Sequence, residues 1–287
     1  MNTKELIKKV RRIEIKTKGL SSQIFSGEYH SAFKGKGMSF AEVREYSAGD
    51  EIRTIDWNVT ARFNEPFVKV FEEERELSVM LIVDISGSEN FGTQNQLKRE
   101  LITEICAVLS FSATSNNDKV GLLLFSDKVE KFIPPRKGKS HTLRIIRELI
   151  EFKPTGKGTN IAEAMRFFTN TIKKRSIAFI LSDFFDKNYL DSMKIANRKH
   201  DLVGIKIYDK RELSIPSMGW VKFLDPETGS SKWINTSRKR TRRRYETLAH
   251  NREQKITSQF KKSGIDIANI ATNEPYIIPL MNLFKRR

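Results

Sequence analysis

The fold of this chain is decided by one stretch, Leu77-Ser78-Val79-Met80-Leu81-Ile82-Val83-Asp84-Ile85-Ser86-Gly87-Ser88. It begins with a nearly continuous apolar run that is rich in β-branched side chains. Such a run is typical of a strand that is buried on both faces of a parallel sheet. The polar residues that follow it then form the loop at the carboxyl end of that strand.

Strands and helices alternate along the rest of this region. Helices are predicted from about 95 to 112, 140 to 152, 160 to 174 and 188 to 199, with a short helix at the carboxyl terminus. Strands are predicted at 119–125, 129–133, 176–181, 202–208 and near 265–270. This alternation predicts an α/β fold with a doubly wound, mostly parallel sheet and helices on both faces. The short connection 126–128 predicts an antiparallel edge at 119–133.

Two modules are expected from the distribution of these patterns. Residues 1–75 combine a helix-like segment at 3–14 with glycines, aromatics and short alternating runs, which indicates a small β-rich N-terminal module. Residues 76–287 are assigned to the larger domain. Within it we expect a hairpin insertion near 220–236 and a basic helix near 237–263.

The chain is strongly basic, because 52 Lys and Arg residues against 35 Asp and Glu residues give a formal net charge of +17. The densest cluster runs from Arg238 to Arg244. An acidic protein, nucleic acid and an anionic membrane surface are therefore the partner classes to consider.

We expect a cytoplasmic protein. The charged N-terminal segment is not followed by the apolar region of a secretory signal. No uncharged apolar run in the sequence approaches the roughly 18 residues that a membrane helix requires. The single cysteine, Cys106, lies in an apolar helical stretch and excludes an internal disulfide.

Side chains with oxygen ligands follow the strands at the edge where open α/β sheets bind ligands. They are Asp84, Ser86 and Ser88 after the first strand, Thr159 before a helix, and Asp183 after the strand at 176–181. A hard cation such as Mg²⁺ prefers these oxygens, and the lack of His and Cys in the set disfavours zinc. A purely structural explanation also exists, in which the two serines cap the next helix and Asp84 ends the strand by turn chemistry.

This set resembles the metal-ion-dependent adhesion site of von Willebrand factor A domains, which combines Asp-x-Ser-x-Ser with a distant Thr and a distant Asp. The resemblance implies that Ser86 and Ser88 coordinate the metal directly, Thr159 directly or through water, and Asp84 and Asp183 mainly through water. Mg²⁺ is the implied ion, with Mn²⁺ or Ca²⁺ as alternatives. A carboxylate from a partner protein then fills the remaining position.

Two acidic residues next to the predicted site, Asp186 and Glu89, are further candidates for a role in binding. Adhesion sites often have Gly after the final Asp, whereas this chain has Asp183-Phe184-Phe185-Asp186, which makes Asp186 a candidate competitor and a candidate partner-binding residue. Glu89, directly after the first motif, either adds negative charge for a partner or faces solvent, and we expect it to face solvent.

A second resemblance lies in the N-terminal module. It is carried by Gly35-Lys36-Gly37-Met38-Ser39-Phe40, by Val43-Arg44-Glu45-Tyr46-Ser47-Ala48-Gly49-Asp50-Glu51-Ile52-Arg53-Thr54-Ile55-Asp56-Trp57, and by Ala61-Arg62. These segments closely resemble the signature of the bacterial "domain of unknown function 58" family, in which they precede a von Willebrand factor A-like domain. The resemblance implies a partnership with a MoxR-type AAA+ ATPase, in aerotolerance or in the maturation of other proteins. Some members carry membrane helices, and none is predicted here.

The charged residues of this signature are expected to form an ion-pair network that joins the two modules, with Trp57 packed beneath it. Its members are Arg44, Asp50, Arg53, Asp56 and Arg62. The alternative is that Arg44, Arg53 and Arg62 bind a partner directly, because Arg and Trp are frequent interface anchors.

These observations predict a non-enzymatic, metal-dependent adaptor that binds a client protein or a MoxR-type AAA+ ATPase, with a chaperone-like or stress-tolerance role. Two alternatives are a nucleic-acid or acidic-surface binding protein that uses the basic helix, and a metal-dependent hydrolase. The four histidines show no metal or triad spacing, and the near-matches to phosphate loops lack the upstream glycine. The basic cluster lacks interleaved aromatic residues apart from Tyr245, which argues against nucleic acid.

Overall fold

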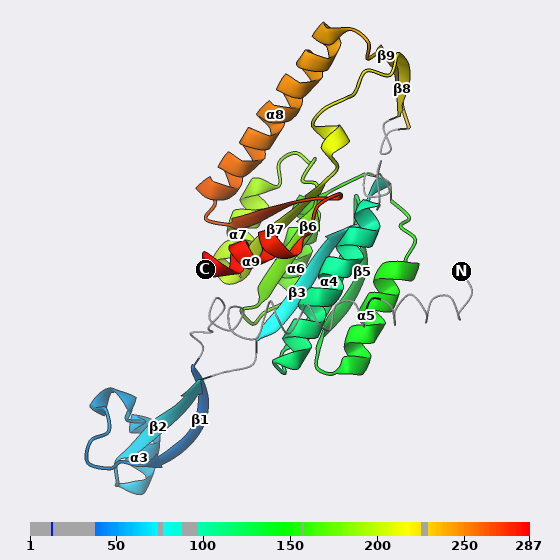
Figure 1. Ribbon diagram of the computed structural model, residues 1–287. Helices are drawn as coiled ribbons and strands as arrows, with labels where there is room; N and C mark the ends of the chain where they lie inside the picture. Colours follow the sequence, from blue (N-terminus) through cyan, green and yellow to red (C-terminus); the bar gives the residue numbers. More distant parts are fainter. Residues whose placement is uncertain (1–12, 14–37, 74–76, 88–96, 157, 225–228) are drawn as a thin grey trace. The chain divides into compact units, whose positions relative to one another are not determined.

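The computed structural model describes residues 13, 38–73, 77–87, 97–156, 158–224 and 229–287. The chain divides into two compact units, of which the smaller is Phe33–Leu77 and the larger contains Ser78–Arg287. Within the described residues, the larger unit is built on a six-stranded sheet with the order β10-β7-β6-β3-β4-β5 (Figure 1).

The sheet confirms the predicted, mostly parallel topology. Five of the described strands are parallel to one another, namely β3 (Ser78–Asp84), β4 (Lys119–Phe125), β6 (Ile177–Ser182), β7 (Asp201–Tyr208) and β10 (Asp266–Ala271). β5 (Val129–Arg136) pairs antiparallel with β4 at one edge. Every residue of β6 is buried, which explains why its sequence is continuously apolar.

Helices cover both faces of this sheet. One face carries α4 (Lys98–Ser115), α5 (Lys139–Glu151) and α9 (Ile277–Lys285), and the other carries α6 (Ile161–Thr171), α7 (Leu190–Lys199) and α8 (Lys239–Lys262) (Figure 1). Alternate strand residues point to opposite faces, so Phe179 contacts Phe284 of α9 while Ala178 and Ile180 pack with α6, α7 and α8. The doubly wound α/β fold is thus confirmed, and it is consistent with a von Willebrand factor A-like domain.

The packing of α8 on the sheet depends on a glycine. Phe260 of α8 is buried over Gly204 of β7. A Cβ atom at residue 204 would lie only 2.5 Å from Cε1 of the Phe260 ring. Any side chain at this position would therefore force the helix or its ring away from the strand.

A hairpin is inserted between β7 and α8. The 3-10 helix η3 (Lys210–Glu212) comes first, and β8 (Trp220–Leu224) then pairs antiparallel with β9 (Ser231–Asn235). Arg242 of α8 donates hydrogen bonds to the carbonyl oxygens of Thr236 (2.6 Å) and Ser237 (2.8 Å), which ties the end of the hairpin to the helix. None of the helices in the described part of the chain combines the length and the apolar character that a membrane span requires.

The smaller unit has the β-rich character that was predicted for the N-terminal module. β1 (Met38–Glu45) pairs antiparallel with β2 (Phe67–Glu73), and η1 (Ile52–Thr54) and α3 (Trp57–Phe63) lie between them in the chain. The helix predicted at 3–14 lies outside the described residues, apart from Ile13.

The charged residues of the smaller unit form local pairs. Arg44 makes a bidentate ion pair with Asp50, with N···O distances of 2.6 and 2.8 Å. Asp56 caps α3 by accepting hydrogen bonds from two backbone N–H groups of its first turn, and it pairs with Lys69 at 3.2 Å. The expectation that Trp57 packs beneath these charges is wrong, since capping by Asp56 makes Trp57 the first helical residue and it is 68% exposed.

The loop between α5 and α6, which carries Thr159, is held against the end of β4 by Glu130. The Glu130 carboxylate accepts hydrogen bonds from the backbone N–H groups of Thr155 (3.0 Å) and Gly156 (2.7 Å) and from the Ser126 hydroxyl (2.8 Å). Burial raises the pKa of Glu130, but these hydrogen bonds outweigh it and hold the pKa below its ordinary value. The Glu130 carboxylate, in its charged form, therefore holds the loop in place.

Replacing Gly156 with alanine is expected to displace this loop. A Cβ atom there would lie 1.8 Å from Oδ1 of Asp127 and 2.3 Å from Oγ of Ser126. We expect the free energy of unfolding, measured by urea denaturation, to fall by about 1–3 kcal/mol. Gly158→Ala is the matched control, because its Cβ would make an ordinary contact of 3.7 Å with Asp127. Equal losses in the two variants would contradict this account.

His200 is expected to make stability depend on pH. Its ring is buried against Phe168, with the ring centroids 4.3 Å apart, and neither ring nitrogen has a hydrogen-bond partner among the described residues. Burial, assisted by the charges of Lys199 and Arg175, lowers the pKa of His200 from 6.5 to about 4. The unfolded chain therefore binds one more proton between these two values, and stability is lost as the pH falls through that window.

The variant His200→Phe should lose about 2 kcal/mol less than the wild type when the pH falls from about 7 to about 5. Urea denaturation at the two pH values measures this difference. His250→Gln is the control, because His250 is exposed on α8 and does not lie against Phe168. The account fails if His200→Phe and the wild type respond equally to pH.

Candidate functional site

The site lies at the point in the sheet where the order of successive strands changes from one side of β3 to the other. From β3 the strands proceed outward through β4 and β5 on one side and through β6, β7 and β10 on the other. In such sheets, the loops after the two strands at this switch point leave a crevice in which ligands bind. β3 and β6 are these strands, with Val83 paired opposite Leu181, so Asp84 and Asp183 reach the same edge.

Asp84 is buried at the end of β3. Its carboxylate accepts hydrogen bonds from the Ser86 backbone N–H (2.9 Å) and from the Ser182 hydroxyl (2.7 Å). Burial, followed by the negative charge of Asp183, raises the pKa of Asp84 to about 7 in spite of these bonds. This edge of the sheet therefore holds buried negative charge that further positive charge would stabilise.

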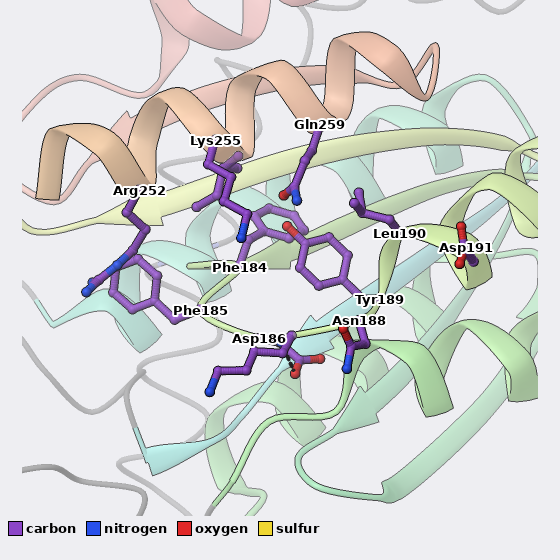
Figure 2. Close-up of a pocket in the computed structure, with 12 residues that line it drawn as sticks. Phe184, Phe185, Asp186, Asn188, Tyr189, Leu190, Asp191, Arg252, Lys255 and Gln259 are labelled. Carbon is purple, nitrogen blue, oxygen red and sulfur yellow. Dashed lines mark hydrogen bonds between the residues drawn. The ribbon is translucent and has the colours of Figure 1, made fainter. Parts of the chain in front are cut away.

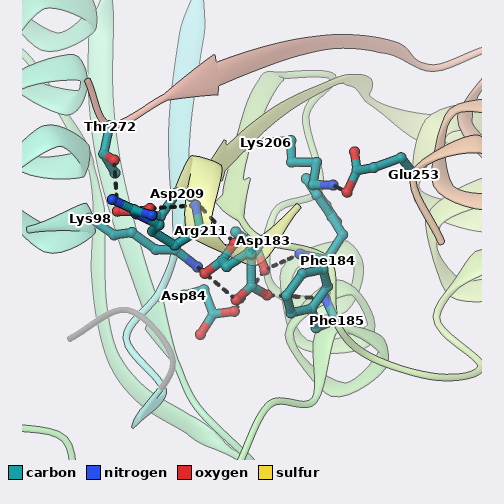
Figure 3. A network of polar contacts seen from close by, with 12 residues as sticks. Asp84, Lys98, Asp183, Phe184, Phe185, Lys206, Asp209, Arg211, Glu253 and Thr272 are labelled. Atoms are coloured by element: carbon teal, nitrogen blue, oxygen red, sulfur yellow. Dashed lines mark hydrogen bonds and ion pairs between the residues drawn. The ribbon is translucent and has the colours of Figure 1, made fainter. Parts of the chain in front are cut away.

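Asp183 is buried beside Asp84 and is paired with a lysine that was not in the predicted set. Its Oδ1 accepts a hydrogen bond from the Phe185 backbone N–H (3.0 Å), and its Oδ2 lies 3.2 Å from Nζ of Lys98 (Figure 3). Lys98 is fully buried and also pairs with Glu212 of η3 at 2.5 Å. Burial raises the pKa of Glu212 and Lys98 opposes that rise, with a net increase. One ammonium group thus pairs with two carboxylates, and Asp84 is a third carboxylate beside Asp183.

A sequence signal for the buried lysine exists in α4. Lys98 shares the i, i+3, i+4, i+7 spacing of Leu101, Ile102 and Ile105, all of which are buried. A lysine in line with the apolar face of a helix indicates a buried ammonium group that needs a carboxylate partner. The signal does not identify the partners, because Asp183 and Glu212 come from distant parts of the chain.

A second buried lysine links the site to α8. Lys206 of β7 forms an ion pair with Glu253 of α8 (Figure 3). Burial lowers the pKa of Lys206, and the pair with Glu253 opposes this effect. The ring of Phe185 lies among three cationic groups, with Lys98, Lys206 and Arg252 at 5.8, 5.6 and 4.6 Å from its centroid. The loop after Asp183 is therefore held against α8 by charge as well as by packing.

Phe184 occupies the position where adhesion sites often have glycine, and its backbone explains that preference. Its φ angle is +59°, in the left-handed region that disfavours side chains with a Cβ. The Phe184 ring is buried against Phe260, with a centroid distance of 4.8 Å and a T-shaped geometry, and it lies 6.1 Å from the ring of Tyr189. Burial of this aromatic ring offsets the strain of the backbone.

Of the remaining predicted ligands, the structure describes Thr159, in the loop between α5 and α6. Thr159 lies in a loop that is anchored on one side by the hydrogen bond from Asn160 N to Ser126 O (2.8 Å). On the other side, Ile161 N donates to Asp186 Oδ2 (2.8 Å). Asp186 thus caps α6, burial raises its pKa, and its role in partner binding stays a prediction. Ser88 and Glu89 lie outside the described residues.

A pocket of about 810 Å³ adjoins the loop after Asp183 (Figure 2). It lies between this loop and α8, with the rings of Phe185 and Tyr189 on the loop side. Its charged lining residues are Lys187, Arg252 and Lys255, together with Asp186 and Asp191. The pocket begins directly after Asp183 in the sequence, because Phe184 is its first lining residue.

The donor set fits a hard divalent cation. Asp84, Ser86 and Asp183 bring carboxylate and hydroxyl oxygens together at one edge, as Mg²⁺ requires. Among the described residues, no three His, Cys, Asp or Glu side chains are grouped so that they could hold a metal ion by themselves. A metal at this edge would therefore depend on hydroxyl groups and water as well as on the carboxylates. A simple oxygen shell would contain no ammonium group, but here Nζ of Lys98 lies against the Asp183 carboxylate.

The predicted arginines lie in the smaller unit. Arg44 is engaged with Asp50, Arg53 lies in η1 and Arg62 in α3. Arg62 is exposed at the end of its helix. Partner binding by these arginines stays a prediction.

Comparison with solved structures finds distant similarities. An aerotolerance-related membrane protein from Bacteroides fragilis matches with a TM-score of 0.50 and 14% sequence identity, over 74% of this chain and 100% of that chain. BatB from Bacteroides thetaiotaomicron matches with a TM-score of 0.49 and 16% identity, over 73% of this chain and 98% of that chain. At 14% identity, the match to the Bacteroides fragilis protein supports a shared fold and nothing about function.

Comparison with curated sequences finds bacterial relatives. The uncharacterized protein Rv1480 of Mycobacterium tuberculosis is 29% identical over 223 residues, which cover 77% of this chain and 70% of that protein. The uncharacterized protein YeaD of Bacillus subtilis is 28% identical over 109 residues, which cover 38% of this chain and 25% of that protein. The family model described as "Protein of unknown function DUF58" matches residues 42–255, which span most of both units. The chain belongs to this family, whose signature its N-terminal module resembles.

Proposed function

We propose that this edge of the sheet holds Mg²⁺ and that the chain uses the bound ion to grip a carboxylate of a partner protein, without catalysing a reaction. The observation that carries the proposal is the pair of buried carboxylates, Asp84 and Asp183, on adjacent parallel strands at the switch point. Burial and the negative charge of Asp183 raise the pKa of Asp84 to about 7, which supports a gain in stability from a further cation.

Each predicted residue has a distinct part in this proposal. Ser86 and Ser88 would supply hydroxyl oxygens, Thr159 a further hydroxyl, and Asp84 and Asp183 negative charge that acts mainly through water. A shell with few directly bound charges leaves the ion electrophilic, so a carboxylate from a partner adds appreciable affinity. Mn²⁺ and Ca²⁺ share this preference for oxygen ligands and are alternative ions.

Lys98 is expected to limit the affinity of the site for metal. Its ammonium group lies 3.2 Å from Asp183 and would repel a dication bound to the same carboxylate. The Lys98 ammonium group is paired with Asp183 and Glu212, so we expect the ion to lie nearer to Asp84 and Ser86. We therefore expect modest Mg²⁺ affinity that rises when a partner carboxylate completes the shell.

The partner proposed from the family resemblance is a MoxR-type AAA+ ATPase, or a client protein that such an ATPase remodels. The pocket next to Asp183 supports a protein partner, because it lies beside the proposed metal position and carries three cationic side chains. A chaperone-like or stress-tolerance role fits the word "aerotolerance" in the description of a Bacteroides fragilis protein with the same fold.

The variant Asp84→Ala is expected to weaken Mg²⁺ binding about 10- to 100-fold, because the residue orients and charges the shell around the ion. Isothermal titration calorimetry measures this affinity. Pull-downs from cell extract, with Mg²⁺ and with EDTA, should recover a partner only with the wild type in Mg²⁺. Ser86→Ala gives a second variant with a smaller structural effect, and Glu151→Gln is the control, since Glu151 is exposed on α5. Identical partners in every condition would contradict the proposal.

The variant Lys98→Met is expected to make stability dependent on Mg²⁺. Loss of the ammonium group leaves Asp183 and Glu212 buried without their ion pair, which costs about 3–5 kcal/mol in EDTA. Saturating Mg²⁺ should restore more stability to this variant than it adds to the wild type, because the repulsion is gone. Urea denaturation with and without Mg²⁺ measures both effects.

The control for this experiment is Lys131→Met. Lys131 forms a partly exposed pair with Glu148 at 2.6 Å, so its loss should cost at most about 1 kcal/mol and show no dependence on Mg²⁺. If Mg²⁺ stabilises Lys98→Met no more than the wild type, Lys98 does not compete with a metal for Asp183.

A further inference from the structure

We propose that the β8–β9 hairpin and the adjoining amino-terminal end of α8 form a surface that docks onto an anionic lipid bilayer. This surface lies at the far end of α8 from the sheet edge where that helix packs (Figure 1). The inference uses none of the residues of the proposed metal site and is independent of it.

The outer face of the hairpin is apolar and exposed. Exposure alternates along β8, so that Trp220, Lys222 and Leu224 face outward while Val221 and Phe223 are half-buried. Trp220 and Leu224 are each 65% exposed. Large apolar side chains gathered on one exposed face indicate an interaction surface rather than part of the core.

The second strand completes this face. Trp233 of β9 is 61% exposed and pairs directly opposite Lys222. It is therefore the diagonal neighbour of both Trp220 and Leu224, at a spacing of about 7–8 Å. Met218, two residues before β8, is 57% exposed as well. The two indole rings and the leucine form one strip with a lysine at its centre.

The inner face of the hairpin fixes this strip in its outward orientation. The ring of Phe223 packs on Tyr245 of α8, with centroids 6.4 Å apart. Arg242 adds the hydrogen bonds to Thr236 and Ser237 that tie the hairpin to the helix. The outer face is therefore held away from the body of the unit.

A cluster of exposed cations continues from this strip. The chain passes from β9 directly into α8, and the basic residues at this junction are exposed, namely Arg238, Lys239, Arg240, Arg243 and Arg244. Lys222 adds positive charge on the outer face of the hairpin itself. The structure thus joins the basic cluster to two tryptophans that lie before it in the sequence.

This combination fits the interface of an anionic bilayer better than other acidic partners. Tryptophan rings prefer the headgroup region, and leucine and methionine gain by entering the acyl boundary. Lys and Arg near an anionic surface each add a factor of about five in affinity. Single-stranded nucleic acid would stack on the indoles, but it offers no comparable gain to Leu224 and Met218. Asp225 and Glu227 follow β8 in the sequence, so we expect docking by the face of the hairpin rather than by its turn.

The test uses intrinsic tryptophan fluorescence. The chain has three tryptophans, so the full-length variant Trp57→Phe reports only on Trp220 and Trp233. With phosphatidylcholine vesicles that contain phosphatidylglycerol, in EDTA, its emission should shift to shorter wavelength and the protein should float with the vesicles. Pure phosphatidylcholine vesicles should give neither effect, and added salt should weaken binding.

Two further variants in the same background separate the apolar and charged contributions. Trp220→Ser with Trp233→Ser removes exposed rings only, so its thermal unfolding should match that of the parent while flotation is lost. Replacing Arg238, Arg240 and Arg244 by glutamine should weaken vesicle binding about a hundredfold.

Three outcomes would overturn the proposal. The first is that the parent does not float with anionic vesicles. The second is that flotation persists undiminished in the folded double tryptophan variant. The third is that the indole emission responds to single-stranded oligothymidylate and not to vesicles, which would make the surface a nucleic-acid site. Because every measurement is made in EDTA, failure of the proposed metal site would leave these results unchanged.

Discussion

The larger unit depends on how two carboxylates are neutralised after they are buried on adjacent parallel strands. Asp84 and Asp183 must meet at the switch point, and the low polarity there makes their mutual repulsion costly. Lys98 brings α4 and, through Glu212, η3 to the site, while the second lysine, Lys206, brings α8. The charge network therefore fastens helices from both faces of the sheet to the edge at which a ligand would bind.

The mostly parallel sheet and most element types follow from the sequence because buried parallel strands have a distinctive apolar composition. The apolar runs at 77–83, 176–181 and 202–208 are strands that are covered on both faces. What the pattern could not give is the effect of local capping and pairing. The helix expected from about residue 95 begins at Lys98, and Trp57 is exposed as the first residue of α3, which Asp56 caps.

The candidate site was predictable only where its residues directly follow strands. Asp84, Ser86 and Asp183 lie at or just after the ends of strands, and the pairing of β3 with β6 brings them to one edge. Lys98 and Glu212 do not, because their contact depends on the packing of α4 and η3, which are far apart in the sequence. The same reason applies to the basic cluster of α8, for which the sequence suggested Tyr245 as the one aromatic neighbour, whereas the hairpin tied to α8 carries two exposed tryptophans.

The left-handed backbone of Phe184 has a consequence for how this chain can change over evolution. With glycine at residue 184, the loop after Asp183 would need no support from the core. With phenylalanine, the loop relies on Phe260, and Phe260 in turn leaves no space for a side chain at Gly204. A substitution at residue 184, 204 or 260 therefore changes the fit of the other two, so that these positions in the loop, β7 and α8 form one packing unit.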